Sequence, residues 1–502
     1  MATRPHPEPA LAAARADRSF FGHPRGLATL FFTEMWERFS YYGMRAILIL
    51  FMTAPVARGG LGFPVVKAGA VYGLYTAMVY LLSLPGGWMA DRITGQRRAV
   101  LYGGSLIALG EFCLVYPAES TFYLGLALLM LGTGMLKPNV STIVGQLYAP
   151  GDGRRDAGFS IFYMGINLGA LIAPLACGWV AERIGWRLGF GVAGLGMLVG
   201  VVQYLFGYRH LGTAGLHPSS TGDPAADRRQ KRKAGIAATG VFAAIGLVAL
   251  LGASGVVTIT TQGISDTLGV FLILITVGVF SWLLLGKGWS TDERKRSAAI
   301  LVLFLAASLF WAMFENAGSS FNLFAQRWTD RHIFGFEFPA SWLQFVPPSM
   351  VVLLAPVFAW LWTRLGSREP SSPAKFTFGL LCGGLGFLIL VPAAAQTGNG
   401  ALASVWFLVG VYFMHTIGEL CLSPVGLSAM TKLAPARVTG MMMGVFFLSN
   451  SVGNYMAGRV ASLFESMSLR NLFGTVAAVG LGAAVVMALL IKPTKRLMSG
   501  VK

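Results

Sequence analysis

The sequence predicts an all-α integral membrane protein with fourteen spanning helices. Of its 502 residues, 55% are hydrophobic and only 12% are charged, whereas soluble domains carry roughly 25% charged residues. The mean hydropathy is +0.64. The apolar residues gather in stretches of about 20, the length that crosses roughly 30 Å of hydrocarbon. The 64 glycines suit helices that pack closely in lipid.

The first half of the chain is expected to form a six-helix bundle over residues 27–207, after a cytoplasmic segment at 1–26. That segment lacks the apolar core of a cleavable signal peptide, so membrane insertion is expected to begin at the first span. A polar, basic linker then follows at 208–233 and is expected to connect two halves at the surface. The six apolar stretches of the bundle are 27–54, 69–90, 99–117, 121–148, 156–181 and 187–207.

The second half is expected to repeat this arrangement after two extra helices. Residues 234–296 hold two apolar stretches, 234–260 and 267–286, and a connector, with nothing ionisable that a substrate site needs inside either stretch. The second bundle covers 297–491, and 492–502 form a cytoplasmic tail. Its six stretches are 297–324, 341–364, 373–393, 401–433, 437–462 and 473–491.

The positions of the lysines and arginines explain why the chain has a net charge of +18. Most of them lie in loops that flank every second span, and positively charged loops stay in the cytoplasm. We therefore expect a multi-pass protein of the cell inner membrane with both termini cytoplasmic, and no nucleic-acid partner. The basic linker is also suited to contact with anionic membrane lipid.

Motifs for catalysis and metal binding are missing from the sequence. The four cysteines lie inside apolar stretches without CxxC spacing, which favours buried packing over a disulfide framework or a zinc site. Neither HExxH nor GxSxG occurs. The sequence therefore predicts no enzyme, no catalytic residue, no metal and no cofactor.

The first span carries charges at bilayer depth, where each retained charge suggests a functional site. The spacing of Glu34, Glu37 and Arg38 places these three side chains on one helical face. The same face continues through Tyr41, Tyr42 and Arg45. Two carboxylates beside arginines predict a site for a coupling proton. The alternative is a static salt-bridge cluster that only holds helices together.

The other spans contain complementary charges. Lys137 lies in the fourth span, and Glu315 and Glu419 lie in the second half. If the halves are related by pseudo-symmetry, these groups surround one central cavity, where a zwitterion fits with its carboxylate on Arg45 and Lys137 and its ammonium on Glu419.

Several uncharged or weakly charged residues leave two interpretations open. Asn167 either contacts substrate or bridges helices, and Tyr80, like Tyr41 and Tyr42, either lines the cavity or packs in the core. His415 either modulates Glu419 or is structural. Two charged residues are left without a role, namely Glu111 and Arg459.

Three motifs resemble those of the proton-dependent oligopeptide transporter family, within the major facilitator superfamily. They are Glu34-x-x-Glu37-Arg38-Phe39-x-Tyr41-Tyr42-Gly43, Phe162-Tyr163-x-x-Ile166-Asn167-x-Gly169 and Gly418-Glu419-Leu420-x-x-Ser423-Pro424-x-Gly426. The resemblance implies a major facilitator fold of two six-helix bundles with two additional helices between them. It also implies that the first-helix carboxylates couple protons, that Arg45 and Lys137 receive the peptide carboxylate, and that Glu419 and Asn167 receive its amino terminus. Glu315 is implied to exchange salt bridges with Arg45 and Lys137.

We therefore expect a proton-coupled symporter that imports di- and tripeptides by alternating access. Its partners are short peptides, protons and membrane lipid, with the proton as coupling ion. The same fold could instead carry another small solute, such as nitrate or a metabolite. A receptor or scaffold that transports nothing is a further alternative.

Overall fold

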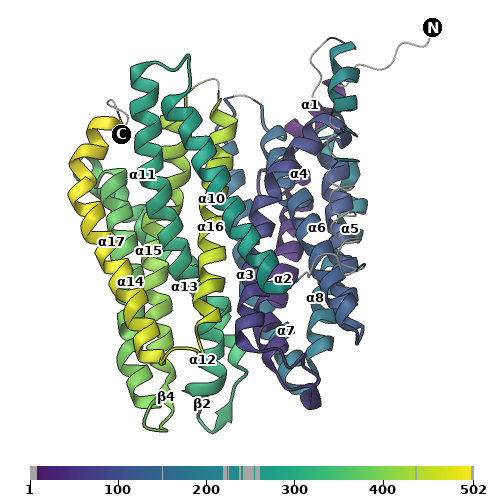
Figure 1. The fold of residues 1–502 in the computed structure, drawn as a ribbon. Helices are drawn as coiled ribbons and strands as arrows, with labels where there is room; N and C mark the ends of the chain where they lie inside the picture. The colour runs from purple at the N-terminus through teal and green to yellow at the C-terminus, as the bar shows by residue number, and fades with distance from the viewer. Residues whose placement is uncertain are drawn as a thin grey trace. The chain divides into compact units, whose positions relative to one another are not determined.

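The structure is a computed structural model, drawn as a ribbon in Figure 1. It describes residues 8–149, 151–218, 223, 225–233, 235–236, 239–240, 254, 260–435 and 438–498. These residues form two compact units, each built from several stretches of the chain.

The first unit comprises Met1–Met44, Leu81–Ala173 and Phe190–Ile264. Within it α5 packs along α6, and α4 packs on α6. Residues 225–233 of the predicted linker are helical. Its other described helices are α1 (Glu8–Ala16), the beginning of α2 (Arg25–Thr53), α4 (Ser83–Met89), the π-helical η2 (Ala90–Thr94), α5 (Gln96–Val115), α6 (Glu119–Gln146), the beginning of α7 (Arg155–Arg183), most of α8 (Trp186–Gly207) and η3 (Tyr208–Leu211).

The second unit comprises Arg45–Tyr80, Pro174–Gly189 and Ser265–Lys502. It therefore includes the ends of α2 and α7, so segments from the first half of the sequence pack with the second half. The remaining helices are η1 (Val56–Arg58), α3 (Val65–Leu81), α10 (Thr261–Leu285), α11 (Thr291–Phe314), η4 (Glu315–Gly318), α12 (Ser320–Trp328), η5 (Ala340–Phe345), α13 (Val346–Leu365), η6 (Gly366–Arg368), α14 (Ser372–Thr397), α15 (Val405–Leu433), α16 (Thr439–Ser462) and α17 (Leu469–Leu497).

Among the described residues, strands occur only as short pairs in the second unit. Two residues of β1 (Thr329–Asp330) pair in parallel with β4 (Ala403–Ser404), and β2 (His332–Ile333) pairs antiparallel with β3 (Phe336–Glu337). The turn between β2 and β3 consists of Phe334 and Gly335, both with positive φ, as a two-residue hairpin turn requires.

Local sequence explains where helices begin. Ser290 starts α11 by accepting a hydrogen bond from the backbone N–H of Glu293, whose side chain accepts in return from the backbone N–H of Ser290. This reciprocal cap satisfies two backbone donors that the helix leaves free. In the same unit α14 runs beside both α15 and α17.

The helices confirm the all-α prediction. Within the described residues, eleven helices have the length and composition to cross a membrane, and α2 and α16, with 29 and 24 residues, are long as well. The predicted span at 234–260 lies largely outside the described residues, and the division into two bundles stays a prediction.

Candidate functional site

A buried cluster of charges lies on α2 in the first unit. Glu34, Glu37 and Arg38 are 2%, 0% and 3% exposed. Arg38 donates from Nη2 to Glu37 Oε1 at 2.6 Å and from Nε to the second oxygen of Glu37, and its Nε lies 3.4 Å from Glu34 Oε1. The other oxygen of Glu34 has no hydrogen-bond partner in the described structure. Two carboxylates and one guanidinium carry a net charge of −1, so one bound proton makes this cluster neutral.

Aromatic rings cover the same cluster. The guanidinium carbon of Arg38 lies 4.9 Å from the ring centroid of Tyr41 and 5.9 Å from that of Tyr42, close enough for a cation–π interaction. The rings of Tyr41 and Tyr42 meet edge to face. Of the three tyrosines expected either to line the cavity or to pack in the core, Tyr41 and Tyr42 therefore contact Arg38.

The glycine of the fifth-span motif brings α7 against this cluster. A Cβ atom at Gly169 would lie 2.3 Å from the carbonyl oxygen of Met35 and 3.0 Å from Cβ of Arg38. Only glycine allows the two backbones to approach so closely. Asn167, one half-turn earlier on α7, donates from its side-chain amide to the carbonyl of Tyr163 at 3.0 Å.

Lys137 adds a second cation to the first unit. It is half-buried on α6, directly before Pro138, which lies inside that helix. Lys137 and Glu34 belong to the same unit. The predicted proton site and the predicted carboxylate receptor therefore lie within one unit.

A second charged cluster lies in the second unit. Arg45 forms an ion pair with Glu315 and donates from Nε to the hydroxyl of Tyr72 at 2.7 Å. Arg45 and Glu315 are 5% and 2% exposed. The backbone of Gly318 packs directly against Tyr72 and Arg45, because a Cβ atom there would lie 1.9 Å from the Tyr72 hydroxyl and 2.8 Å from Arg45 Nε.

Glu419 is the other carboxylate of the second unit that was predicted to bind substrate, and no cationic side chain pairs with it among the described residues. It is half-buried on α15, and the charge of Glu315 acts on it. In the described part of the chain it forms no ion pair. Arg45 is paired with Glu315, so when both carboxylates are ionised one negative charge is left without a cation. Charges at this depth require a partner.

The structure also places four other residues that were singled out in the sequence. His415 is buried between Phe314, Phe321 and Phe387, and its Nε2 lies 3.3 Å from the carbonyl of Gly383. Glu111 is fully buried and accepts from Ser40 at 2.9 Å. Arg459 pairs with Asp266 near the surface. Tyr80 is half-buried at the end of α3.

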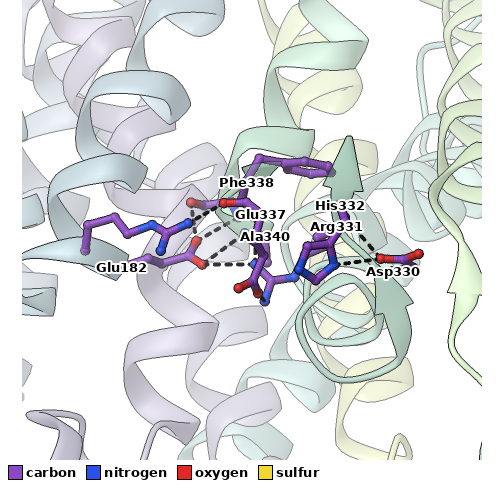
Figure 2. Close-up of polar contacts among 9 residues, drawn as sticks. Glu182, Asp330, Arg331, His332, Glu337, Phe338 and Ala340 are labelled. Atoms are coloured by element: carbon purple, nitrogen blue, oxygen red, sulfur yellow. Dashed lines mark hydrogen bonds and ion pairs between the residues drawn. The ribbon is translucent and has the colours of Figure 1, made fainter. Parts of the chain in front are cut away.

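A polar clasp in the second unit joins the end of α7 to the loop before α13. We use this name for Glu182, Arg331, Glu337, Ala340 and Ser341, and Figure 2 shows Glu182 directed at the backbone of Ala340. Glu182 accepts from the N–H groups of Ala340 and Ser341, each at 2.9 Å, and from the Ser341 hydroxyl at 2.5 Å. These are the free donors at the beginning of η5.

Arg331 extends the clasp across the hairpin. It donates to the carbonyl of Phe338 and to the carboxylate of Glu337, each at 2.7 Å, and lies 3.8 Å from Glu182. Asp330 at the end of β1 accepts hydrogen bonds from the ring and from the backbone N–H of His332 in β2, and these bonds lower the pKa of Asp330. Sequence reasoning missed the clasp, since its residues come from the end of α7, the region of the β2–β3 hairpin and the beginning of η5, and none of them belongs to a recognisable motif.

Glu182→Ala is expected to loosen this clasp. The substitution leaves the N–H groups of Ala340 and Ser341 buried without an acceptor, at a cost of about 1–3 kcal/mol. Hydrogen exchange at these two amides should therefore accelerate by roughly 10-fold or more. Glu337→Ala is the control, because it removes only a contact to Arg331. Unchanged exchange in Glu182→Ala would contradict the role of this carboxylate.

Residues 97–479 of the chain match the family model described as the POT family. The chain belongs to the POT family. It is 41% identical over 500 residues to the peptide transporter YePEPT of Yersinia enterocolitica subsp. palearctica serotype O:3 (strain YE-P4), with 96% of each chain covered. It is 38% identical over 498 residues to a di-/tripeptide transporter of Lactococcus lactis subsp. cremoris, covering 97% of this chain and 99% of that one.

Solved structures agree with this POT assignment. A crystal structure of a mutant peptide transporter POT in complex with alafosfalin matches with a TM-score of 0.91 and 40% identity, over 99% of this chain and 100% of that one. The chain is therefore a multi-pass membrane protein with the all-α fold of POT transporters, as the sequence predicted.

In this POT family member, the charged residues predicted for the site are divided between the two units. In the first unit Glu34, Glu37 and Arg38 are joined by Lys137, and in the second unit Arg45, Glu315 and Glu419 lie together. Their roles stay predictions. Tyr72 was not predicted, because a tyrosine within an apolar stretch carries no signal of function until its hydroxyl is seen on Arg45.

Proposed function

We propose that this chain is a proton-coupled symporter that imports di- and tripeptides. The observation that carries the proposal is Glu419, a half-buried carboxylate on a spanning helix that forms no ion pair among the described residues, in the same unit as the ion pair of Arg45 and Glu315. The ammonium of a peptide supplies the missing positive charge. Two relatives named as peptide transporters, each matched over nearly its whole length, support this substrate class.

The coupling ion is proposed to be a proton carried by Glu34 or Glu37, with no cofactor. When Glu34 is ionised, Lys137 balances it. When Glu34 binds a proton, Lys137 is released to bind the carboxylate of the peptide, and the substrate and the proton therefore enter together. Arg45 offers a second cation once Glu315 lets it go.

Alternating access is proposed to follow from contacts inside the second unit. The Arg45–Glu315 pair and the clasp both join segments from the first half of the sequence to the second half. We infer that they hold the outer end closed and separate when that end opens. This assignment takes both termini as cytoplasmic in the inner membrane, in line with the bias of positive loops.

Uptake of radiolabelled di-alanine and tri-alanine into proteoliposomes tests the proposal. With an inward pH gradient and an inside-negative potential, both peptides are expected to accumulate above their external concentration. Without the gradients they should only equilibrate, which separates a coupled carrier from a facilitator. Failure to move either peptide while nitrate is accumulated would favour the other small-solute interpretation, and a receptor would move neither.

A further inference from the structure

An exposed aromatic surface lies at the β2–β3 hairpin of the second unit, next to the clasp. The rings of Trp179 and Phe336 stack with their centroids 6.1 Å apart, and the ring of Trp342 lies 5.8 Å from the first and 6.1 Å from the second. Trp179 and Phe336 are 38% and 44% exposed, and Phe334 in the turn of the hairpin is fully exposed. We call Trp179, Phe334, Phe336 and Trp342 the hairpin surface. Contiguous exposed apolar patches mark sites of protein or membrane contact.

The hairpin surface lies beside the last turns of α7. The indole N–H of Trp342 donates to the carbonyl of Leu175 at 3.1 Å, and Phe336 stacks on Trp179. Leu175 lies about two turns and Trp179 about one turn before Arg183, where α7 ends. Because α7 has the length and composition of a membrane span, the hairpin folds back along a spanning helix and does not simply project beyond its end.

A second spanning stretch begins at the same surface. Trp342 lies in the first turn of Ala340–Leu365, which also has the length and composition of a membrane span. Few residues of this stretch are buried inside the protein, and its exposed side chains include Leu353 and Val357. In a membrane protein, such exposed apolar side chains on a spanning helix meet acyl chains. The hairpin surface is therefore continuous with a face that contacts lipid.

The residue types of the hairpin surface are those of a membrane–water interface. Tryptophan is enriched there, because its ring is apolar and its N–H is polar. The guanidinium carbon of Arg183 lies 5.5 Å from the ring centroid of Trp179 and 6.0 Å from that of Phe336, and Arg183 donates to the carbonyl of Glu337. An arginine in this position keeps its charge among headgroups while its stem covers apolar surface. This combination favours lipid over a second protein as the occupant.

We propose that the hairpin surface is a membrane anchor, which inserts Phe334 into the boundary between headgroups and acyl chains at the end of α7. Interfacial segments lie roughly 5–10 Å deep in this boundary. Glu337 belongs to the same hairpin, and its partner Arg331 directly precedes β2. The anchor therefore attaches the clasp to the membrane surface. The inference does not depend on the peptide as substrate.

Spin-label EPR of the full-length chain in phosphatidylcholine proteoliposomes tests the inference, with a nitroxide on Phe334→Cys. The matched control is Asn399→Cys, because Asn399 is also exposed and lies in the loop before β4, which pairs with β1. The unaltered chain, labelled in the same way, gives the background of the four native cysteines. The label at 334 is expected to collide several-fold more with oxygen than with a water-soluble nickel chelate, at a depth of roughly 5–10 Å. The label at 399 should favour the nickel chelate.

The results separate lipid from the other possible occupants. Equal access of the nickel chelate to positions 334 and 399 means that the hairpin faces water, which overturns the proposal. Dipolar broadening of the label at 334 that disappears on dilution with unlabelled protein assigns the surface to a second copy of the chain and also overturns it. Thermal unfolding in detergent shows that each labelled chain is folded, and Phe334 is fully exposed, so its replacement should leave the transition unchanged. Uptake of di-alanine is measured separately, so failure of one proposal leaves the other intact.

Discussion

Glu34→Gln is expected to abolish uphill uptake of dipeptide and to spare counterflow. Glutamine keeps the shape and the hydrogen-bonding capacity of the side chain but cannot gain or lose a proton near neutral pH. A potential of 100 mV supplies about 2.3 kcal/mol per charge and a tenfold proton gradient about 1.4 kcal/mol, so one proton sustains accumulation of roughly 500-fold. In the variant the ratio of internal to external peptide should fall to about 1.

Counterflow distinguishes lost coupling from a damaged carrier. Exchange of internal for external peptide needs no net proton movement, so Glu34→Gln should retain it within a fewfold range. Glu37→Gln should also lose uphill uptake, with lower thermal stability because Glu37 accepts hydrogen bonds from Nε and Nη2 of Arg38. The matched control is Glu111→Gln, a fully buried glutamate that bonds only Ser40 and faces no cation among the described residues. Uptake that still follows the pH gradient in both cluster variants would contradict the assignment.

The cluster on α2 could be predicted from sequence because two general rules act on it together. The helical period places Glu34, Glu37 and Arg38 on one face, and the cost of a charge in lipid requires that face to point inward. Both rules use only neighbours along one helix. The same reasoning puts Arg45 on that face, and its pairing with Glu315, implied by the family resemblance, is present in the structure.

Contacts between distant segments could not be predicted in this way. The clasp joins Glu182 to Ser341 across 159 positions, and Tyr72 reaches Arg45 from another helix. Glu182 and Ser341 are polar residues near helix ends, and Tyr72 is a tyrosine in an apolar stretch. Neither pattern differs from that of ordinary surface or core residues. Their partners follow from tertiary packing, which no local period encodes.

Glu419→Gln is expected to weaken dipeptide binding by at least about 30-fold. Truncating the charge of a buried hydrogen-bonded pair costs about 2–5 kcal/mol, and Glu419 has no protein cation among the described residues that could hide this loss. The negative charge that is left on Glu315 is already paired with Arg45, so it cannot replace Glu419 without breaking that pair. The concentration of di-alanine that half-inhibits counterflow of labelled peptide measures the change.

The substrate itself supplies the sharpest control for Glu419. N-acetyl-di-alanine keeps the carboxylate and both side chains but lacks the ammonium, so it should bind the unaltered protein weakly and lose nothing further in Glu419→Gln. A cycle of two proteins and two ligands then isolates the pair of ammonium and carboxylate, free of any general damage to the fold. If Glu419→Gln weakens both ligands by the same factor, Glu419 supports the cavity without contacting the amino terminus. The unbalanced carboxylate of the second unit would then need another partner, and the case for a peptide substrate would lose its main structural support.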